Sequence, residues 1–354
     1  MAFSNHYHFH SISFVILALG FWASQASARP LDLHKALLIR KRHEQWMTQH
    51  GRVYKDEIEK EKRFNIFKKN IEYIENFNGN NASSNKMFTL GVNAFTDLTT
   101  EEFIATHTGY KRQFHSISNG SMTMEFSYEN LTDYDISPSV DWREQGAVTG
   151  IKYQGQCEGC WAFSVVAAVE GLNRIKFGQL ISLSEEELID CVQEDGCRGG
   201  DVSKAYTFTQ QNQGITTEGE YPYTAYYGYQ GQCQAWNAGG NTVTINGYQN
   251  VPQNDEISLM QAVSRQPVSA GIDASSADFK SYSGGIYYNQ MCGTSYYDLN
   301  HAVTIIGYGY DDTYGTNYWL IKNSWGESWG ENGYMRIIKD QNQCGISMAA
   351  SYPI

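Results

Sequence analysis

The chain has 354 residues, of which 41% are hydrophobic and 18% are charged. This composition excludes wholesale disorder, and the length is sufficient for two or three domains. The net charge of −12 argues against a nucleic-acid-binding protein, because phosphate contacts need an excess of lysine and arginine.

Charge, cysteine and histidine all divide the chain near residue 135. Residues 29–135 contain 15 basic and 15 acidic residues, whereas residues 136–354 contain 11 basic and 23 acidic residues. All seven cysteines lie in the second piece, which holds only one of the nine histidines, His301. We therefore expect two pieces with different roles.

The N-terminus has the pattern of a secretory signal peptide over residues 1–28. An apolar run of nine residues, FVILALGFW at 14–22, is too short to span a bilayer, and Ala-Ser-Ala at 26–28 resembles a cleavage site. The alternative is the start of a buried helix. Secretory entry favours disulfides, and with no ER-retrieval ending the expected destination is the vacuole or lysosome, or the extracellular space. Three glycosylation sequons begin at Asn81, Asn119 and Asn130.

Periodic patterns predict helices in both pieces. Apolar residues at helical spacing predict helices over 33–78, whereas the polar, aperiodic stretch 109–135 predicts an exposed linker. A buried helix is predicted over 161–176. The capping-box pattern Ser-Glu-Glu-Glu at 184–187 predicts the start of a second helix, and a third is expected over about 202–211.

From residue 242 onward the pattern changes to strands. Short β-branched and aromatic runs such as TVTINGY, PVSAGIDA and HAVTIIGYGY are separated by glycine and asparagine. Helices followed by strands predict an α+β fold with two lobes. We expect a helical lobe over about 145–245 and a β-rich, barrel-like lobe over about 246–340.

Seven cysteines leave one unpaired if the other six form disulfides. The pair Cys157-x-x-Cys160 has three possible explanations: a redox motif, a zinc site, or three disulfides with one reactive thiol. A redox motif would need a βαβ setting, and a zinc site would need a second close cysteine pair or clustered histidines. The sequence supplies neither, so we favour the third explanation and expect no metal.

Cys160 is the candidate for the reactive thiol. It directly precedes the predicted helix at residue 161, and a helix N-terminus stabilises a thiolate. A thiol nucleophile also needs a base, and His301 is the single histidine of this piece. A lone histidine at the start of an apolar strand is more often a satisfied core residue, but the odd cysteine favours a catalytic pair.

Three segments resemble the papain-like cysteine peptidases. QGQCEGCWAFS around Cys160 is similar to the active-site segment of that family, NHAVTIIGYG around His301 to its histidine segment, and YWLIKNSWGESWGENGY to its asparagine segment. ISLSEEELIDC and the C-terminal SYPI are most similar to plant enzymes of the family. The first piece is similar to the inhibitory pro-region of the cathepsin L-like branch. The matching positions are Glu59, Arg63, Phe67, Asn70, Ile74 and Asn78, followed by Gly91, Asn93, Phe95 and Asp97.

The resemblance implies a two-lobed papain-like fold for residues 136–354, preceded by an inhibitory helical pro-region over 29–135. It implies that Cys160 is the nucleophile and that His301 is its base and later its acid. Asn323 would orient His301, and Trp325 would shield their hydrogen bond from water. Gln154 would donate its side-chain amide to the oxyanion hole.

The resemblance also implies disulfides and a substrate site. The disulfides would be Cys157–Cys197, Cys191–Cys233 and Cys292–Cys344, which leave Cys160 free. The implied substrate-binding residues are Gly199, Gly200, Asp201, Val202, Gly271, Leu299, Asn300, Trp325 and Ala349. Their small and apolar members predict a roomy hydrophobic pocket for the residue before the scissile one, and Asp201 at the rim would leave some tolerance for basic side chains.

Three positions depart from the usual pattern of the family. Glu158 and Gly159 stand where the family has glycine and then serine or another small residue, and Arg198 replaces an asparagine. We nevertheless predict a cysteine endopeptidase made as a zymogen, activated by removal of the pro-region at acid pH and used in general protein breakdown. The alternative is a catalytically weakened homologue that acts as a binding or storage protein.

The resemblance further implies the partners of such an enzyme. They are protein and peptide substrates, the chain's own pro-region as an inhibitor, and cystatin-type inhibitors. We expect a monomer with no cofactor, no nucleic acid and no membrane span.

Overall fold

The computed structural model describes residues 34–111 except 82–85, and residues 126–354 except 133 and 236–239. The described residues fall into two compact units that divide after Glu72. The predicted signal peptide and the sequon at Asn119 lie outside the described residues, and so does the side chain of Asn81. Asn130 is exposed in a turn. No helix among the described residues is long and apolar enough to cross a membrane.

The first unit contains a helix over residues 34–49 and the first part of α2 (Glu57–Asn81). Their apolar faces meet in an aromatic core, in which the ring of His43 lies 4.9 Å from that of Phe67. On the surface of α2, Arg63 forms an ion pair of 2.7 Å with Glu59, one turn away. The helices predicted over 33–78 are therefore confirmed, with an interruption at residues 50–56.

The second unit begins with the rest of the pro-region. Strand β1 (Phe88–Leu90) pairs antiparallel with β7 (Tyr282–Tyr287) of the later chain. Helix α3 (Thr100–His107) starts with a complete capping box. The side chain of Thr99 accepts from the backbone N–H of Glu102, and the Glu102 carboxylate accepts from the backbone N–H of Thr99.

The helical lobe is built around α4 (Cys160–Phe177), whose residues Cys160 to Asn173 are all buried. A helix that is apolar on every side needs cover on every side. The cover comes from neighbouring short elements: α5 (Glu185–Cys191), η1 (Gly196–Arg198), α6 (Val202–Gln211), η2 (Ala225–Tyr227) and the two-stranded sheet of β3 (Ile215–Thr216) and β4 (Thr242–Val243). All three predicted helices of this lobe are confirmed.

The start of α5 differs from the sequence prediction in one respect. The side chain of Ser184 accepts from the backbone N–H of Glu187, as a cap should. The return bond of a capping box does not form, because the Glu187 carboxylate instead accepts from the backbone N–H of Thr216 at 2.7 Å and from Asn212 at 3.0 Å. The prediction of a helix start was right, and the prediction of a full box was wrong.

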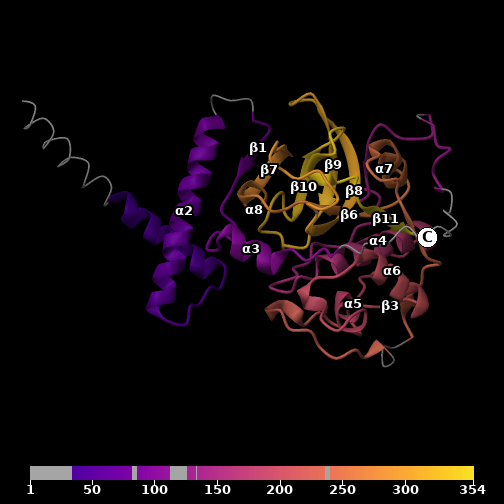
Figure 1. The fold of residues 1–354 in the computed structure, drawn as a ribbon, viewed down its shortest axis with the longest axis horizontal. Coiled ribbons are helices and arrows are strands. Elements are labelled where there is room, and N and C mark those ends of the chain that lie inside the picture. Colours follow the sequence, from indigo (N-terminus) through magenta and orange to yellow (C-terminus); the bar gives the residue numbers. More distant parts are fainter. Residues whose placement is uncertain (1–33, 82–85, 112–125, 133, 236–239) are drawn as a thin grey trace, which may run out of the picture. The chain divides into compact units, whose positions relative to one another are not determined.

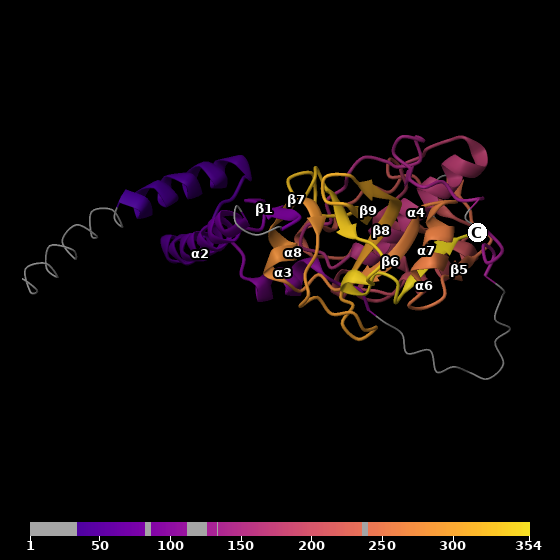
Figure 2. The same cartoon turned by 90° about the horizontal axis from the view of Figure 1, so that it is seen from above.

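The β-rich lobe contains one sheet with the strand order β1-β7-β10-β9-β8-β6-β11-β5, and β2 pairs with β8 (Figures 1 and 2). Its long central strands pair antiparallel and bury both faces over most of their length. The elements not yet bounded are β2 (Val140–Asp141), β5 (Tyr248–Asn250), α7 (Glu256–Val263), β6 (Val268–Ile272), α8 (Ala277–Ser281), β8 (His301–Asp311), β9 (Thr316–Lys322), β10 (Tyr334–Ile338), η4 (Gln343–Gly345) and β11 (Ala350–Pro353).

The two lobes meet where the first turns of α4 lie against β8, as Figure 1 shows. The hydroxyl of Ser164 on α4 donates to the backbone carbonyl of Val303 on β8 at 2.7 Å. This contact sets the N-terminus of α4 beside the first residues of β8. The two positions singled out by the sequence, Cys160 and His301, are the first residues of these two elements.

Candidate active site

Cys160 is the one free cysteine among the described residues, and it is fully buried. Its sulfur accepts a hydrogen bond of 3.4 Å from the backbone N–H of Ala302, the residue after His301. The thiol therefore lies at the N-terminus of an 18-residue helix and against the strand that carries the histidine. Both features favour a thiolate, because backbone N–H groups and the helix dipole stabilise negative charge.

The imidazole of His301 is held by two neighbours. Its Nε2 lies 2.8 Å from Oδ1 of Asn323, and the ring of Trp325 stacks on it at 4.4 Å between centroids. Oδ1 of Asn323 also accepts from the backbone N–H of Ser324, so it is an acceptor and Nε2 carries the proton. Nδ1 has no partner among the described residues and is therefore free to take up a proton.

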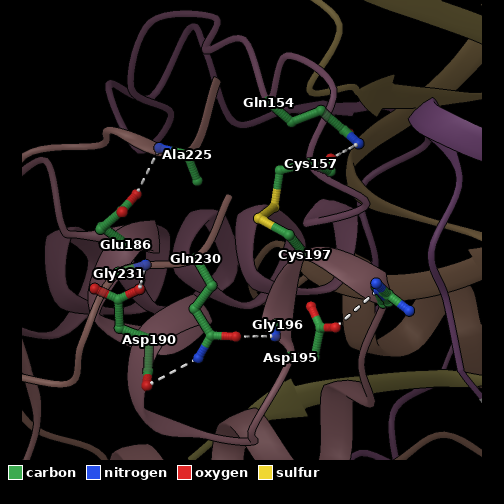
Figure 3. Close-up of a disulfide and its surroundings, with 12 residues drawn as sticks. Gln154, Cys157, Glu186, Asp190, Asp195, Gly196, Cys197, Ala225, Gln230 and Gly231 are labelled. Carbon is green, nitrogen blue, oxygen red and sulfur yellow. Dashed lines mark hydrogen bonds and ion pairs between the residues drawn. A yellow bond between two sulfur atoms is a disulfide. The ribbon is translucent and has the colours of Figure 1, made fainter. Parts of the chain in front are cut away.

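Gln154 is positioned through both ends of its amide. Its Oε1 accepts from the hydroxyl of Ser324 at 2.6 Å, which leaves Nε2 as an aimed donor. Nε2 donates to the backbone carbonyl of Cys157 at 2.8 Å (Figure 3) and to that of His107 at 3.2 Å. The sequence offered no sign of the role of Ser324, because a serine beside a tryptophan has no distinctive spacing.

Burial keeps both members of the pair uncharged in this structure. It raises the pKa of the Cys160 thiol to about 12, although backbone N–H groups of Ala302, Gly109 and Trp161 act in the opposite direction. It lowers the pKa of His301 to about 4, although the hydrogen bond that His301 donates to Asn323 acts in the opposite direction. Burial thus disfavours the charged form of both groups.

The other six cysteines form the three disulfides that the resemblance implied: Cys157–Cys197, Cys191–Cys233 and Cys292–Cys344. The first of these holds the loop before Cys160 against the loop that carries Gly199 and Gly200 (Figure 3). Backbone pairing strengthens the same contact, because the N–H of Glu158 donates to the carbonyl of Cys197 at 3.2 Å.

Residues 107–111, which we call the pro-segment, lie directly over these groups. The backbone N–H groups of Gly109 and Tyr110 both donate to the carbonyl of Asn300 at 2.9 Å. The backbone N–H of Gly200 donates to the carbonyl of Gly109 at 2.8 Å, and the carbonyl of Gly200 accepts from the backbone N–H of Lys111 at 2.8 Å. The prediction of an exposed linker was therefore wrong for Gly109 and Tyr110, because main-chain pairing leaves no pattern in the side chains. Lys111 is exposed, as predicted, although its backbone is paired.

Two of the predicted substrate-binding residues line a hollow next to this pairing. Val202 and Ala349 line a hollow together with Tyr110 of the pro-segment. A methyl group on Gly271 would lie 2.9 Å from Cε1 of Tyr110 and 3.2 Å from Cδ1 of the buried Leu299, so glycine leaves room for an occupant of the pocket.

Asp201 has a structural task in this region. It caps α6 by accepting from the backbone N–H of Lys204 at 2.9 Å, and only 6% of the residue is exposed. A capping carboxylate that is buried in this way is less available to a substrate than the sequence suggested.

A second group of pro-region side chains covers Trp325. Phe95 and Phe103 are fully buried, and the ring of Phe103 lies 4.8 Å from that of Trp325. The indole N–H of Trp325 donates to the carbonyl of His107 at 3.1 Å. The tryptophan that covers the histidine ring on one side thus anchors the pro-region on the other.

The comparisons with known proteins agree with this site. The sequence profile of the papain family cysteine proteases matches residues 136–354, and that of the cathepsin propeptide inhibitor domain matches residues 43–103. The chain belongs to the papain family of cysteine proteases. It is 46% identical to fruit bromelain of Ananas comosus over 336 residues, which cover 94% of this chain and 90% of bromelain.

Further relatives of this papain-family chain are plant enzymes and proforms. The senescence-specific cysteine protease SAG12 of Arabidopsis thaliana is 46% identical over 353 residues, 98% of either chain. The structure of recombinant stem bromelain precursor has a TM-score of 0.78 and 42% identity, and covers 89% of this chain and 98% of its own. The structure of the proform of the ragweed pollen allergen Amb a 11 has a TM-score of 0.79 and 37% identity, and the match covers 89% of this chain and 94% of the allergen chain.

These matches establish the general class of the protein. It is a papain-like cysteine endopeptidase with the two-lobed fold of that family, most similar to plant enzymes of the cathepsin L-like branch. It carries a cathepsin-type inhibitory pro-region and is therefore made as a zymogen. The fold class and the family predicted from the sequence are confirmed.

Proposed function

We propose that Cys160 and His301 hydrolyse peptide bonds through an acyl-enzyme. The observation that carries the proposal is the orientation of His301, whose Nε2 is bound by Asn323 while Nδ1 stays free as a base. Once the pro-segment leaves, Nδ1 accepts the proton of the Cys160 thiol. The thiolate then adds to the carbonyl carbon of the scissile bond, and the imidazolium returns the proton to the departing amine.

The amide of Gln154 and the backbone N–H of Cys160 serve as the oxyanion hole. In the structure the Gln154 amide already donates to a backbone carbonyl of the pro-segment, that of His107. It is thus aimed at a carbonyl oxygen that lies in the cleft. Each such donor stabilises the tetrahedral intermediate by roughly 3 kcal/mol. Water then hydrolyses the thioester, with His301 as the base.

We further propose that acid pH releases the pro-region. Lys280 of α8 is 1% exposed, and its Nζ donates to the backbone carbonyl of Leu98 in the pro-region at 2.7 Å. Burial lowers the pKa of Lys280 to about 8, and the pro-region carboxylates Asp97, Glu101 and Glu102 counteract this effect. A hydrogen bond to its own backbone and one to Thr99 hold the pKa of the Glu101 carboxyl below its ordinary value. When acid protonates Glu101, the buried ammonium loses a counter-charge, so docking weakens as pH falls.

The test of both proposals is self-processing of the full chain. At neutral pH the chain should stay intact, and at pH 4–5 it should lose residues up to about 130–136. The Cys160→Ser variant should remain unprocessed at pH 4–5 unless active enzyme is added. If the variant matured alone at the wild-type rate, self-cleavage by Cys160 would be wrong.

The pocket beside Gly271 should select a bulky apolar or aromatic side chain one residue before the scissile one. The proximity of the Tyr110 ring to Gly271 supports this proposal, because an aromatic side chain lies where glycine leaves room. Burial of a leucine or phenylalanine there would contribute about 1.5–3 kcal/mol. Profiling with a peptide library checks this expectation, and a preference for acidic residues at that position would contradict it.

The physiological setting rests on the relatives and the N-terminal pattern. SAG12 is described as senescence-specific, and a further relative of 45% identity in Arabidopsis thaliana is a KDEL-tailed cysteine endopeptidase. We propose general protein breakdown in the vacuole, the lysosome or the extracellular space, with cystatin-type inhibitors as regulators of the mature monomer. Localisation of a fluorescent fusion of the full chain would test the compartment.

A further inference from the structure

Glu158 lies in the wall of the cleft, between the disulfide cysteine Cys157 and the nucleophile. It is half-buried, and its backbone is pinned to Cys197. The main chain of the pro-segment passes in direct contact with it: a methyl group on Gly109 would lie 2.5 Å from Cβ of Glu158 and 2.1 Å from its carbonyl oxygen. Any peptide that runs along this wall therefore passes the Glu158 side chain at close range.

Three charged side chains act on the Glu158 carboxylate: Lys111, Asp195 and Arg198. Arg198 and Asp195, its two charged neighbours on the enzyme, form an ion pair of 2.9 Å with each other (Figure 3). Asp195 raises the Glu158 pKa and Arg198 lowers it, and Arg198 is mostly exposed to solvent. The remaining charged group that acts on Glu158 is Lys111 of the pro-segment, whose positive charge lowers the Glu158 pKa against the larger raising effect of burial.

The geometry of the pro-segment explains why Lys111 faces this wall. Tyr110 pairs with Gly200 in a parallel bridge, so the segment is locally extended. Side chains alternate in an extended chain, and residues two apart lie on the same side. Tyr110 lines the hollow with Val202 and Ala349, whereas position 109 lies against Glu158. By the alternation, position 111 lies on the same side as position 109. Glycine at 109 avoids the wall, and lysine at 111 matches its charge.

We propose that Glu158 makes this wall a cation-selective subsite of the active enzyme. The subsite would recognise a lysine or arginine of the substrate at the position that Lys111 takes in the pro-segment. This position is next to the substrate residue that enters the pocket, and it lies farther from the Cys160 thiol than that residue. This inference rests on the proposed peptidase function. Glu158 binds the substrate and takes no part in the chemical steps.

The test compares matched peptide substrates after activation of the full-length chain at acid pH. The peptides share an apolar pocket residue and differ only at the neighbouring position, which is lysine, glutamine or glutamate. Wild-type enzyme should show a kcat/KM about threefold higher for lysine than for glutamine at low ionic strength, and the ratio should fall as salt is added. Glu158→Gln should bring the ratio to about one.

Two further variants make the result specific. Glu158→Lys should reverse the order, so that the glutamate peptide is cleaved faster than the lysine peptide. Glu194→Gln removes an exposed negative charge from the loop that carries Asp195, and it should keep the wild-type ratio. These paired outcomes separate a local contact from the net charge of the enzyme.

The outcomes also separate this inference from the proposed function. Absence of cleavage of every peptide would contradict the peptidase function itself. Cleavage with no preference for lysine, or with a preference that Glu158→Gln leaves unchanged, would overturn the subsite. A charge preference confined to the residue directly before the scissile bond would also overturn it, because it would place the contact at the position of Gly109.

Discussion

Removal of the Phe103 side chain should open the zymogen at neutral pH. Phe103 is 0% exposed and lies between the ring of His107, which stacks on it at 5.2 Å, and the ring of Trp325 at 4.8 Å. Because Trp325 belongs to the peptidase and covers His301, this contact joins the pro-region to the catalytic site. The Phe103→Ala variant deletes it without touching any group of the catalytic pair.

The size of the effect follows from burial. Replacing a fully buried phenylalanine by alanine costs about 3–5 kcal/mol. Phe103 also contacts Phe95 and His107 inside the pro-region. These contacts are kept when the pro-region leaves as a unit, so their share of the cost does not weaken docking. If about half of the cost belongs to the contact with Trp325, docking weakens by about 2 kcal/mol, which corresponds to roughly a 30-fold larger open fraction.

The assay is the rate at which a peptidyl epoxide labels Cys160 in the full-length chain at pH 7. The variant should be labelled about 30-fold faster than wild type. Ile58→Ala is the control, because Ile58 on α2 is 84% exposed and its loss should leave the rate unchanged. If Phe103→Ala is labelled at the wild-type rate, the aromatic contact does not hold the pro-region in place.

Three further outcomes test the site and its support. Lys152→Ala should lower the free energy of unfolding by about 3–5 kcal/mol in urea titrations, because Lys152 binds the buried Glu185 carboxylate at 2.8 Å; an unchanged midpoint would contradict this. Asn323→Ala should lower kcat about 10- to 100-fold with little change in KM, because His301 loses the acceptor that orients it; a loss confined to KM would count against an orienting role. Glu158→Gln should move both limbs of the pH–rate curve on a neutral substrate to lower pH by about 0.3 unit, because the carboxylate raises the Cys160 pKa and favours the imidazolium. Limbs that stay in place or move apart would refute the last prediction.

Local patterns were sufficient for the elements and for the candidate pair. Helix α4 was predicted because its apolar residues recur at helical spacing, and β8 because a β-branched run begins at His301. The odd number of cysteines predicted one free thiol, and the position of Cys160 just before the predicted helix made it the candidate, which the structure confirms. These inferences succeed because periodicity, parity and residue type are properties of the chain alone.

The pro-segment shows where such inference ends. Gly109 and Tyr110 enter the cleft through backbone hydrogen bonds to Asn300, and every peptide group offers the same donors whatever its side chain. A polar, aperiodic stretch therefore looks like a linker even when it is paired. In the same way, Glu187 had the spacing of a capping box. Its carboxylate instead accepts a hydrogen bond from the backbone N–H of Thr216, which only folding brings close.

The sequence by itself determined which chemical groups this protease has: one free thiol, one histidine in its second piece, and an acidic residue two positions before the thiol. Tertiary structure decided which of them meet and in which protonation state. Packing of α4 on β8 places the thiol beside the histidine strand, and burial holds Cys160 and His301 neutral. Cys160 and His301 are more than a hundred residues apart in the sequence. The distance between them and their exposure to solvent are therefore defined only when their segments pack together, and both quantities control the pKa values.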